Sequence, residues 1–283
     1  MNQSQEMATK KSNLITIAGF GTIIILTLIL IILMINSIGS INSKIESINK
    51  SLELESEDHY MNIQREVAES VVIVFSFPVN SGNSSSDVIF LDDTGQSWNI
   101  GTGFSIDNKG TILTANHVVQ GADKVVVIHQ TTTTSDVSID TTAIPIQVSR
   151  IKSVPDLDLA ILYTNSSITP VKIQTGNVNG MSSFLGSSIA FIGYPLSIPI
   201  NGKNIPIQTT VRGSVSGIVP FPYQNQEVLV YVLGAAANKG NSGGPVFSLK
   251  TGEVIGIINK KFGEKESIAI STAINQNLIN KLV

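Results

Sequence analysis

Two kinds of hydrophobic pattern divide the chain. From Leu14 to Ile35 no residue is charged and most are apolar, which predicts a helix long enough to cross a membrane, since about 20 such residues suffice. From Val67 onward the apolar residues instead gather in short runs separated by Gly, Asn, Asp and Pro, which is typical of β-strands and turns. Residues 36–66 form a linker between these two regions.

The linker has its own apolar periodicity. Its apolar residues follow one another at alternating steps of three and four: Ile38, Ile41, Ile45, Ile48 and Leu52. This is the a/d spacing of a short coiled coil, so the linker predicts self-association. Because two heptads are marginally stable alone, the alternative is an amphipathic stalk helix that packs on the domain or on the membrane surface.

The apolar run at residues 14–35 has two other interpretations. The apolar core of a cleaved signal peptide is usually about 7–15 residues, shorter than this run. A buried helix of a soluble protein usually keeps a polar face, which this run lacks. We therefore expect an uncleaved signal anchor. Lys10 and Lys11 precede it, so the positive-inside rule places residues 1–13 in the cytoplasm and the long remainder outside a single-pass cell membrane.

The region from Val67 to the carboxyl end predicts an all-β domain, residues 67–283, closed by one helix. Many short strands at regular spacing indicate a sandwich or a barrel. The predicted strands are Val71–Phe75, Trp98–Ile106, Thr111–Ala115, Lys124–Ile128, Ile144–Arg150, Leu159–Tyr163, Ser188–Ile192, Thr209–Ile218, Val228–Leu233, Pro245–Leu249, Val254–Ile258 and Ser267–Ser271, with a helix at Ala273–Leu282.

Composition narrows the classes of function. The chain has 283 residues, 42% of them hydrophobic, which is enough for one sizeable domain. A net charge of −3 without a basic patch argues against nucleic acid as a partner. There is no cysteine, which excludes disulfides and thiol catalysis. No metal and no cofactor is expected.

The strongest candidate chemistry lies in the stretch Gly240–Pro245, which reads GNSGGP. Glycines permit the close backbone approach that an oxyanion hole beside a serine nucleophile requires. Such a serine needs a histidine base and a carboxylate that orients it. Upstream, His117 follows a predicted strand, and Asp156 and Asp158 precede another. The order His, Asp, Ser therefore supplies all three groups.

These segments resemble the HtrA/Deg family of trypsin-like serine proteases. The resemblance extends beyond the three catalytic positions to the following stretches: Gly101–Val119, Ala190–Pro195 and Val211–Val219. It implies two six-stranded antiparallel β-barrels with the active site in the cleft between them. His117 and Asp158 would lie on the first barrel and Ser242 on the second. Asp158 is preferred to Asp156 because it directly precedes Leu-Ala-Ile-Leu, as in the family pattern.

The resemblance also assigns roles to individual residues. Ser242 is the expected nucleophile, His117 the base and Asp158 its orienting carboxylate, and the backbone of Gly240, Asn241 and Ser242 would form the oxyanion hole. Ala236 would lie at the base of the specificity pocket, with Ile257, Ile258 and Asn259 as its far wall. Such a pocket is small and uncharged, so we expect cleavage after aliphatic residues such as Val, Ala, Ile or Leu.

The expected protein is thus a membrane-anchored, extracytoplasmic serine endopeptidase that cleaves unfolded or misfolded proteins, in protein quality control and stress response. Family members usually carry PDZ domains and form trimers. Too few residues follow Ser242 for a PDZ domain, so we expect that module to be missing, and the linker to contribute to a homotrimer. The alternative is a chaperone-like protein that keeps the fold but mainly holds unfolded chains. A purely structural surface protein would leave the order His, Asp, Ser unexplained.

Overall fold

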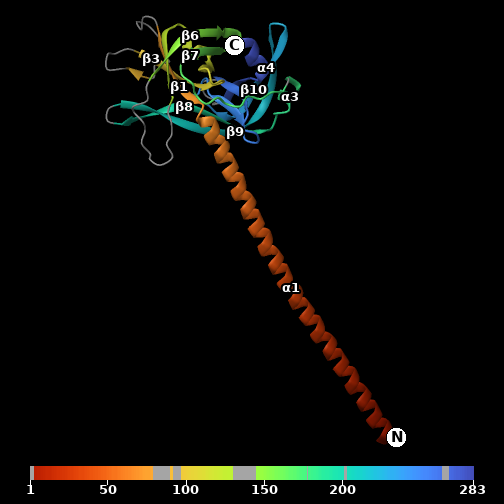
Figure 1. Ribbon diagram of the computed structural model, residues 1–283. Helices are drawn as coiled ribbons and strands as arrows, with labels where there is room; N and C mark the ends of the chain where they lie inside the picture. Colours follow the sequence, from red (N-terminus) through yellow and green to blue (C-terminus); the bar gives the residue numbers. More distant parts are fainter. Residues whose placement is uncertain are drawn as a thin grey trace. The chain divides into compact units, whose positions relative to one another are not determined.

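The computed structural model describes residues 3–78, 90–91, 97–129, 145–176, 178–200, 203–262 and 268–283. Contacts divide the chain into two compact units, Met1–His59 and Tyr60–Val283. One helix, α1 (Gln3–Ala68), makes up the described part of the first unit and reaches the first residues of the second (Figure 1).

Helix α1 contains both the predicted membrane segment and the predicted linker without a break. Its segment Ile25–Lys50 has a mean hydropathy of 2.2 and no buried side chain, so by length and composition it is able to cross a membrane. Ile38, Ile41, Ile45 and Ile48 are each 50–57% exposed. The apolar seam predicted from the sequence is therefore present on a helix and uncovered in the single chain.

The first half of the second unit is a ring of antiparallel strands. The strands are β1 (Val71–Pro78), β3 (Ser97–Ser105), β4 (Thr111–Ala115), β5 (Ala122–His129), β6 (Ile146–Val154) and β7 (Leu159–Thr164). They pair in the order β1-β5-β6-β7-β4-β3, and pairing of β3 with β1 closes the ring. The short strand β2 (Phe90–Leu91) adds to β3.

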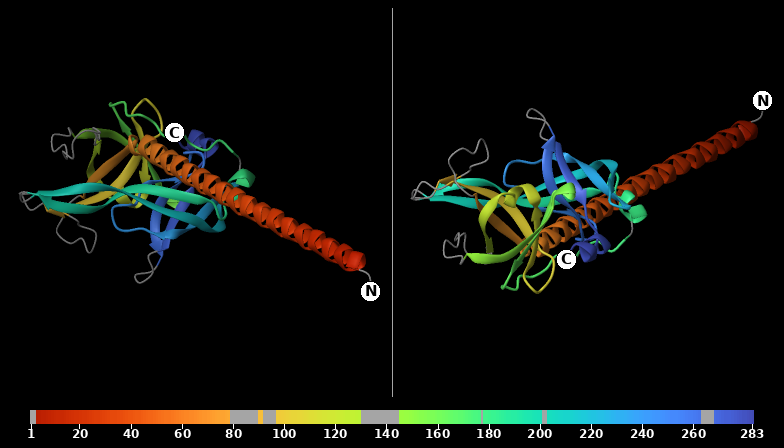
Figure 2. Two further views of the ribbon diagram at one scale, coloured as in Figure 1. Left: turned by 90° about the horizontal axis from the view of Figure 1, so that it is seen from below. Right: turned by 90° about the horizontal axis from the view of Figure 1, so that it is seen from above.

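The second half is a closed six-stranded barrel in the order β10-β13-β12-β11-β8-β9. Its strands are β8 (Ser188–Ile200), β9 (Lys203–Tyr223), β10 (Gln226–Ala236), β11 (Pro245–Ser248), β12 (Val254–Phe262) and β13 (Ile268–Ala273). Both views of Figure 2 show this second barrel, in cyan and blue, beside the yellow and green strands of the first barrel. The short helices are α2 (Asn116–Val119), η1 (Pro155–Leu157), α3 (Val178–Ser182) and α4 (Gln276–Leu282).

The predicted fold of two six-stranded antiparallel barrels is confirmed. Two local details differ. The predicted strand Ser188–Ile192 continues to Ile200 as β8, and its pairing with β9 shifts register between Gly193 and Leu196. Helix α4 begins after the predicted Ala273 because the Asn275 side chain caps it by accepting a hydrogen bond from the Leu278 amide. Ile144 and Ser267, at the predicted starts of two strands, lie outside the described residues.

Three strands of the first barrel, β1, β4 and β7, are apolar on both faces. Val72, Val74, Ile112 and Leu162 belong to one hydrophobic cluster. Their sequence neighbours Ile73, Phe75, Leu113 and Ile161 belong to another, which they share with the second barrel. Because successive residues of a strand point to opposite faces, each run of consecutive apolar residues fills two cores at once.

The last turns of α1, where the predicted linker meets the predicted domain, pack on the barrels. Ile63 and Val67 are buried in the cluster that both barrels share. Glu66 forms an exposed ion pair with Lys172, at 3.1 Å between Oε2 and Nζ. The guanidinium carbon of Arg212 lies 5.4 Å from the ring centre of Tyr60. The compact unit therefore begins at Tyr60, before the predicted first residue of the domain, Val67.

Candidate active site

Strand pairing brings His117 and Asp158 together. His117 lies in α2, directly after β4, and Asp158 lies between η1 and β7. The strands β4 and β7 are paired so that Ala115 faces Leu159. The backbone N–H of Asn116 also donates to the backbone carbonyl of Asp158 at 3.0 Å. The two side chains therefore meet because they leave the same end of neighbouring strands.

The Asp158 carboxylate receives two hydrogen bonds from His117. Its Oδ2 lies 2.8 Å from His117 Nδ1, and its Oδ1 accepts the His117 backbone N–H at 2.9 Å. Asp158 itself adopts a left-handed backbone conformation, with φ of 50°, which aspartate tolerates better than most residues. The side chain of His117 is 36% exposed and that of Asp158 is 17% exposed. The alternative carboxylate, Asp156, is exposed on the 3₁₀ turn.

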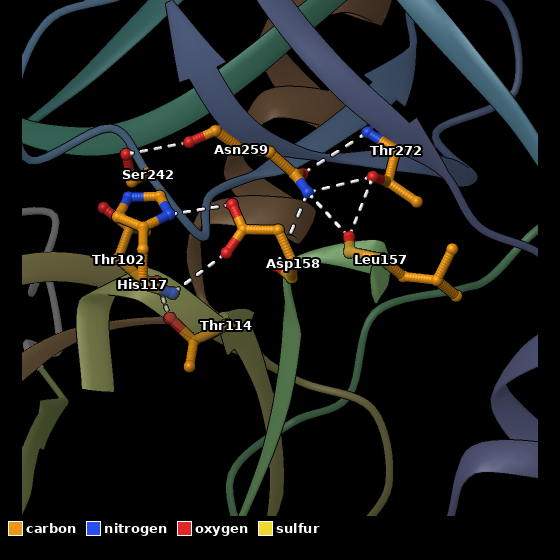
Figure 3. Close-up of polar contacts among 8 residues, drawn as sticks. All are labelled: Thr102, Thr114, His117, Leu157, Asp158, Ser242, Asn259 and Thr272. Atoms are coloured by element: carbon orange, nitrogen blue, oxygen red, sulfur yellow. Dashed lines mark hydrogen bonds and ion pairs between the residues drawn. The ribbon is translucent and has the colours of Figure 1, made fainter. Parts of the chain in front are cut away.

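Ser242 lies between β10 and β11 of the second barrel and shares a pocket of about 90 Å³ with His117. In Figure 3 the imidazole of His117 lies between Asp158 on one side and Ser242 on the other. The Ser242 hydroxyl donates to the carbonyl of Asn259 at 3.3 Å. The remaining pocket residues are Asn99, Ile100, Val118, Lys239 and Gly240.

The turn before Ser242 is a β-turn from Asn238 to Asn241. The Asn241 amide donates to the Asn238 carbonyl at 3.1 Å, and Gly240 has a φ of +91°. A positive φ at the third residue is typical of a type II turn and favours glycine there. This turn type fixes the direction of the Gly240 N–H, because it inverts the central peptide relative to a type I turn.

Of the three backbone amides predicted to form the oxyanion hole, the structure leaves two, those of Gly240 and Ser242, without a hydrogen bond among the described residues. The Asn241 amide is used within the turn. In the described part of the chain the amides of Gly240 and Ser242 form no backbone hydrogen bond. These two donors remain available to a negatively charged oxygen beside Ser242.

The side chain of Asn241 is fully buried, and among the described residues neither its Nδ2 nor its Oδ1 has a hydrogen-bond partner. It lies against Gly193, where an added Cβ would come 2.6 Å from Asn241 Oδ1. An unpaired buried amide is costly, so the loop carries a local energetic penalty directly before Ser242.

The residues predicted to form the specificity pocket are distributed differently from the expectation. Ala236 is exposed at the end of β10, where it pairs with Ile268. Ile257 and Ile258 are buried in two different hydrophobic clusters, on opposite faces of β12. Their side chains thus belong to the core. None of Ala236, Ile257, Ile258 and Asn259 lines the pocket that holds Ser242.

Asn259 instead connects the second barrel to the loop that carries Asp158. Its Nδ2 donates to the Leu157 carbonyl and to Thr272 Oγ1, both at 2.9 Å. Thr272 Oγ1 donates to the same carbonyl at 3.1 Å (Figure 3). Two side chains therefore hold the carbonyl directly before Asp158. No sequence motif indicated Thr272, because its partner Leu157 lies 115 positions away.

The other two histidines lie outside this arrangement. His59 is exposed on α1. His129, at the end of β5, bonds through Nε2 to the Glu69 carbonyl at 2.7 Å.

Comparison with known protein families matches this chain to the trypsin-like peptidase domain. The family model aligns with residues 101–257. A putative serine protease HhoA of Synechocystis is 32% identical over 176 residues, which are 62% of this chain and 40% of the relative. A probable periplasmic serine endoprotease DegP-like of Brucella suis is 31% identical over 65% of this chain and 32% of its own length. The chain thus spans about a third to two fifths of these relatives.

Solved structures show the same fold. The HtrA-type protease AlgW with a tripeptide superposes with a TM-score of 0.54 at 22% identity, over 78% of this chain and 61% of that one. The Rv3671c protease of M. tuberculosis in its active form gives a TM-score of 0.51 at 20% identity, over 78% and 82% of the two chains.

Proposed function

Since the chain belongs to the family of trypsin-like peptidase domains, with relatives of the HtrA and DegP type, we propose that it is a serine endopeptidase using His117, Asp158 and Ser242. The observation that carries this proposal is the double hydrogen bond from His117 to Asp158, on a histidine that shares its pocket with Ser242.

In this mechanism Ser242 Oγ attacks the scissile carbonyl carbon while His117 Nε2 accepts the hydroxyl proton. Asp158, bonded to Nδ1, keeps the imidazole in the tautomer whose Nε2 is free and stabilises the imidazolium that forms. The C–N bond then breaks as His117 protonates the amine, leaving an acyl-enzyme that water hydrolyses with the same base. The Ser242 hydroxyl must first rotate away from the Asn259 carbonyl.

The amides of Gly240 and Ser242 would stabilise the oxyanion of the tetrahedral intermediate. Removing one such donor typically lowers turnover by a factor of about 10²–10³. The positive φ of Gly240 supports this role, because it sets the direction of one of the two donors.

We further propose that α1 anchors the chain in the cell membrane through residues 14–35, with the peptidase unit outside the cytoplasm. Support comes from the apolar segment of α1, from Lys10 and Lys11 before it, and from a relative named periplasmic. Protease added to intact cells or spheroplasts should digest the peptidase unit. A unit digested only after membrane lysis would contradict this topology.

The proposed substrates are unfolded or misfolded proteins, cleaved after small to medium aliphatic residues, in a quality-control role. The support that remains for this specificity is Ala236, which the family resemblance places at the base of the specificity pocket: it is small and uncharged, and a basic substrate residue would lose its hydration there without finding a partner. Trimers formed with help from the Ile38–Leu52 seam are part of the proposal.

The test is turnover of casein, an unfolded protein, by the full-length chain in detergent. We expect wild type to produce acid-soluble peptides and Ser242→Ala to produce none. The chaperone-like alternative predicts instead that both proteins suppress aggregation of a denatured client equally and that neither cleaves it. Mass spectrometry of the peptides reports the residue before each cut.

A further inference from the structure

Thr102 of the first barrel forms two hydrogen bonds with the turn at Gly240–Ser242. It lies in β3, within the motif Gly101–Phe104, and is fully buried. Its partners belong to three segments far apart in the sequence: the β8 irregularity at Tyr194, the turn at Gly240–Ser242, and β4 at Thr114.

The hydroxyl of Thr102 is used both as donor and as acceptor. It donates to the Gly240 carbonyl at 2.6 Å and accepts the Tyr194 amide at 3.1 Å. The backbone of Thr102 makes two more bonds: its N–H donates to the Ser242 carbonyl at 2.8 Å, and its carbonyl accepts from Thr114 Oγ1 at 2.7 Å.

These bonds hold the peptide before Asn241 and the peptide after Ser242. The carbonyl of Gly240 belongs to the Gly240–Asn241 peptide, and the carbonyl of Ser242 belongs to the Ser242–Gly243 peptide. The Ser242 N–H belongs to the Asn241–Ser242 peptide, which lies between these two. The Gly240 N–H belongs to the Lys239–Gly240 peptide, which comes before them. Once the flanking peptides are held, the dihedral angles that aim both amides have little freedom.

The bond to the Gly240 carbonyl has a particular consequence for a type II turn. Rotation of the central peptide would convert it toward a type I turn, remove the positive φ of Gly240 and redirect its N–H. Such rotation changes the dihedral angles of Gly240 and tilts the carbonyl that Thr102 holds. In the described part of the chain the side chain of Asn241 has no hydrogen-bond partner, so contacts from outside the turn contribute to its order.

We propose that Thr102 is a positioning residue for the peptidase reaction: its hydroxyl, reaching from the first barrel, holds the turn of the second barrel so that the Gly240 and Ser242 amides point to one place. This inference rests on the proposed function. It assigns to the hydroxyl of Thr102 an effect on turnover rather than on substrate binding, because the oxyanion exists only after Ser242 has attacked.

The test uses the full-length protein in detergent with three variants. Thr102→Val keeps the backbone bonds and the branched shape but removes the hydroxyl, whereas Thr102→Ser keeps the hydroxyl. Thr164→Val is the matched control, because Thr164 is also a buried threonine of the first barrel whose hydroxyl donates to a backbone carbonyl, that of Gly110 at 3.0 Å. It lies at the far end of β7 from Asp158.

Two readouts are taken for each protein: kcat and KM for a peptide substrate, and amide hydrogen exchange over residues 236–246. We expect Thr102→Val to lower kcat by about tenfold or more with KM changed less than about threefold. The amides of Asn241, Gly243 and Gly244, which are hydrogen-bonded in wild type, should exchange faster in this variant. Thr102→Ser and Thr164→Val should match wild type in both readouts.

The proposal is overturned if Thr102→Val keeps a wild-type kcat, if Thr102→Ser is as impaired as Thr102→Val, or if exchange of the turn is unchanged in Thr102→Val. Should Thr102→Val fail to fold, Thr102→Ala is measured in its place, with the same expectations. A wild type that hydrolyses no peptide refutes the proposed function, and the exchange comparison then still decides whether Thr102 holds the turn.

Discussion

His117 and Asp158 are joined by two hydrogen bonds, one from the imidazole Nδ1 and one from the backbone N–H, each to a different carboxylate oxygen. Both oxygens of Asp158 are therefore used by one residue. The imidazole cannot turn without losing the first bond, and the helix start that carries it cannot shift without losing the second. This arrangement fixes which ring nitrogen is left to face Ser242.

Replacement of Asp158 by asparagine should therefore lower kcat severely. The amide group can present its N–H to Nδ1, which leaves the wrong tautomer for a base at Nε2, and losses of about 10⁴ in turnover are typical of such a change. Steady-state kinetics on a peptide substrate measures the effect. Asp156→Asn is the control, because Asp156 is exposed nearby and should be replaceable without loss. The opposite ranking of the two variants would move the carboxylate role to Asp156.

Asn259 and Thr272 should influence both stability and turnover. Both side chains donate to the Leu157 carbonyl. Thr272→Val therefore leaves this carbonyl only the Asn259 donor, and Asn259→Ala leaves it only the Thr272 donor. Loss of a buried hydrogen bond costs about 1–3 kcal/mol of unfolding free energy. Urea unfolding measures this cost, and kcat should fall as well because Asp158 follows the loosened carbonyl.

The control for this pair is Thr251→Val, at an exposed threonine in the turn after β11. It should change neither quantity. If Asn259→Ala and Thr272→Val lower stability but leave kcat at the wild-type value, the two side chains stabilise the fold without positioning Asp158.

The buried, unpartnered amide of Asn241 predicts a pH-dependent response to Asn241→Asp. Among the described residues a carboxylate at this place would find no hydrogen-bond partner, so we expect burial to raise its pKa above the value of about 3.9 for a free aspartate. Below a pH of about 3.9 the carboxyl is protonated in both the folded and the unfolded protein, and the variant should be nearly as stable as wild type. As pH rises, only the unfolded chain ionises readily, and the deficit grows by up to about 1.4 kcal/mol per pH unit until the folded carboxyl ionises too.

Urea unfolding of Asn241→Asp and wild type at pH 4 and pH 7 measures this difference. Asn277→Asp is the control, because Asn277 is exposed and its replacement should show no such trend. Equal stability of Asn241→Asp and wild type at both pH values would mean that a cationic partner reaches the site.

The two barrels were predictable because strand patterns are local, and the apolar runs at Val71, Thr111 and Leu159 begin within a residue of observed strands. Short motifs predicted His117, Asp158 and Ser242 as the catalytic residues, and these roles stay a proposal. The sequence did not indicate that Ile257 and Ile258 face the cores, because they lie in a strand buried on both faces, where periodicity does not distinguish a core side chain from a pocket side chain. The roles of Thr102 and Thr272 depend on carbonyls more than a hundred positions away.

The seam on α1 predicts self-association. Ile41 and Ile45 are about half exposed in the single chain, and a partner helix would bury them. Sedimentation of the full-length protein in density-matched detergent should give an oligomer for wild type and a smaller species for the double variant Ile41→Asn, Ile45→Asn. Ser43→Asn, off the seam on the same helix, should keep the wild-type mass. Equal masses for wild type and the double variant would remove the seam from the proposal.

The central claim, that Ser242 is a nucleophile activated by His117, is tested most directly by covalent labelling. A fluorophosphonate reacts with an activated serine and releases fluoride, leaving a phosphonylated hydroxyl. Treatment of the full-length protein, followed by mass spectrometry of its peptides, should place the modification on Ser242, and His117→Ala should remove most of it. Label on another serine, or equal labelling of wild type and His117→Ala, would contradict the claim.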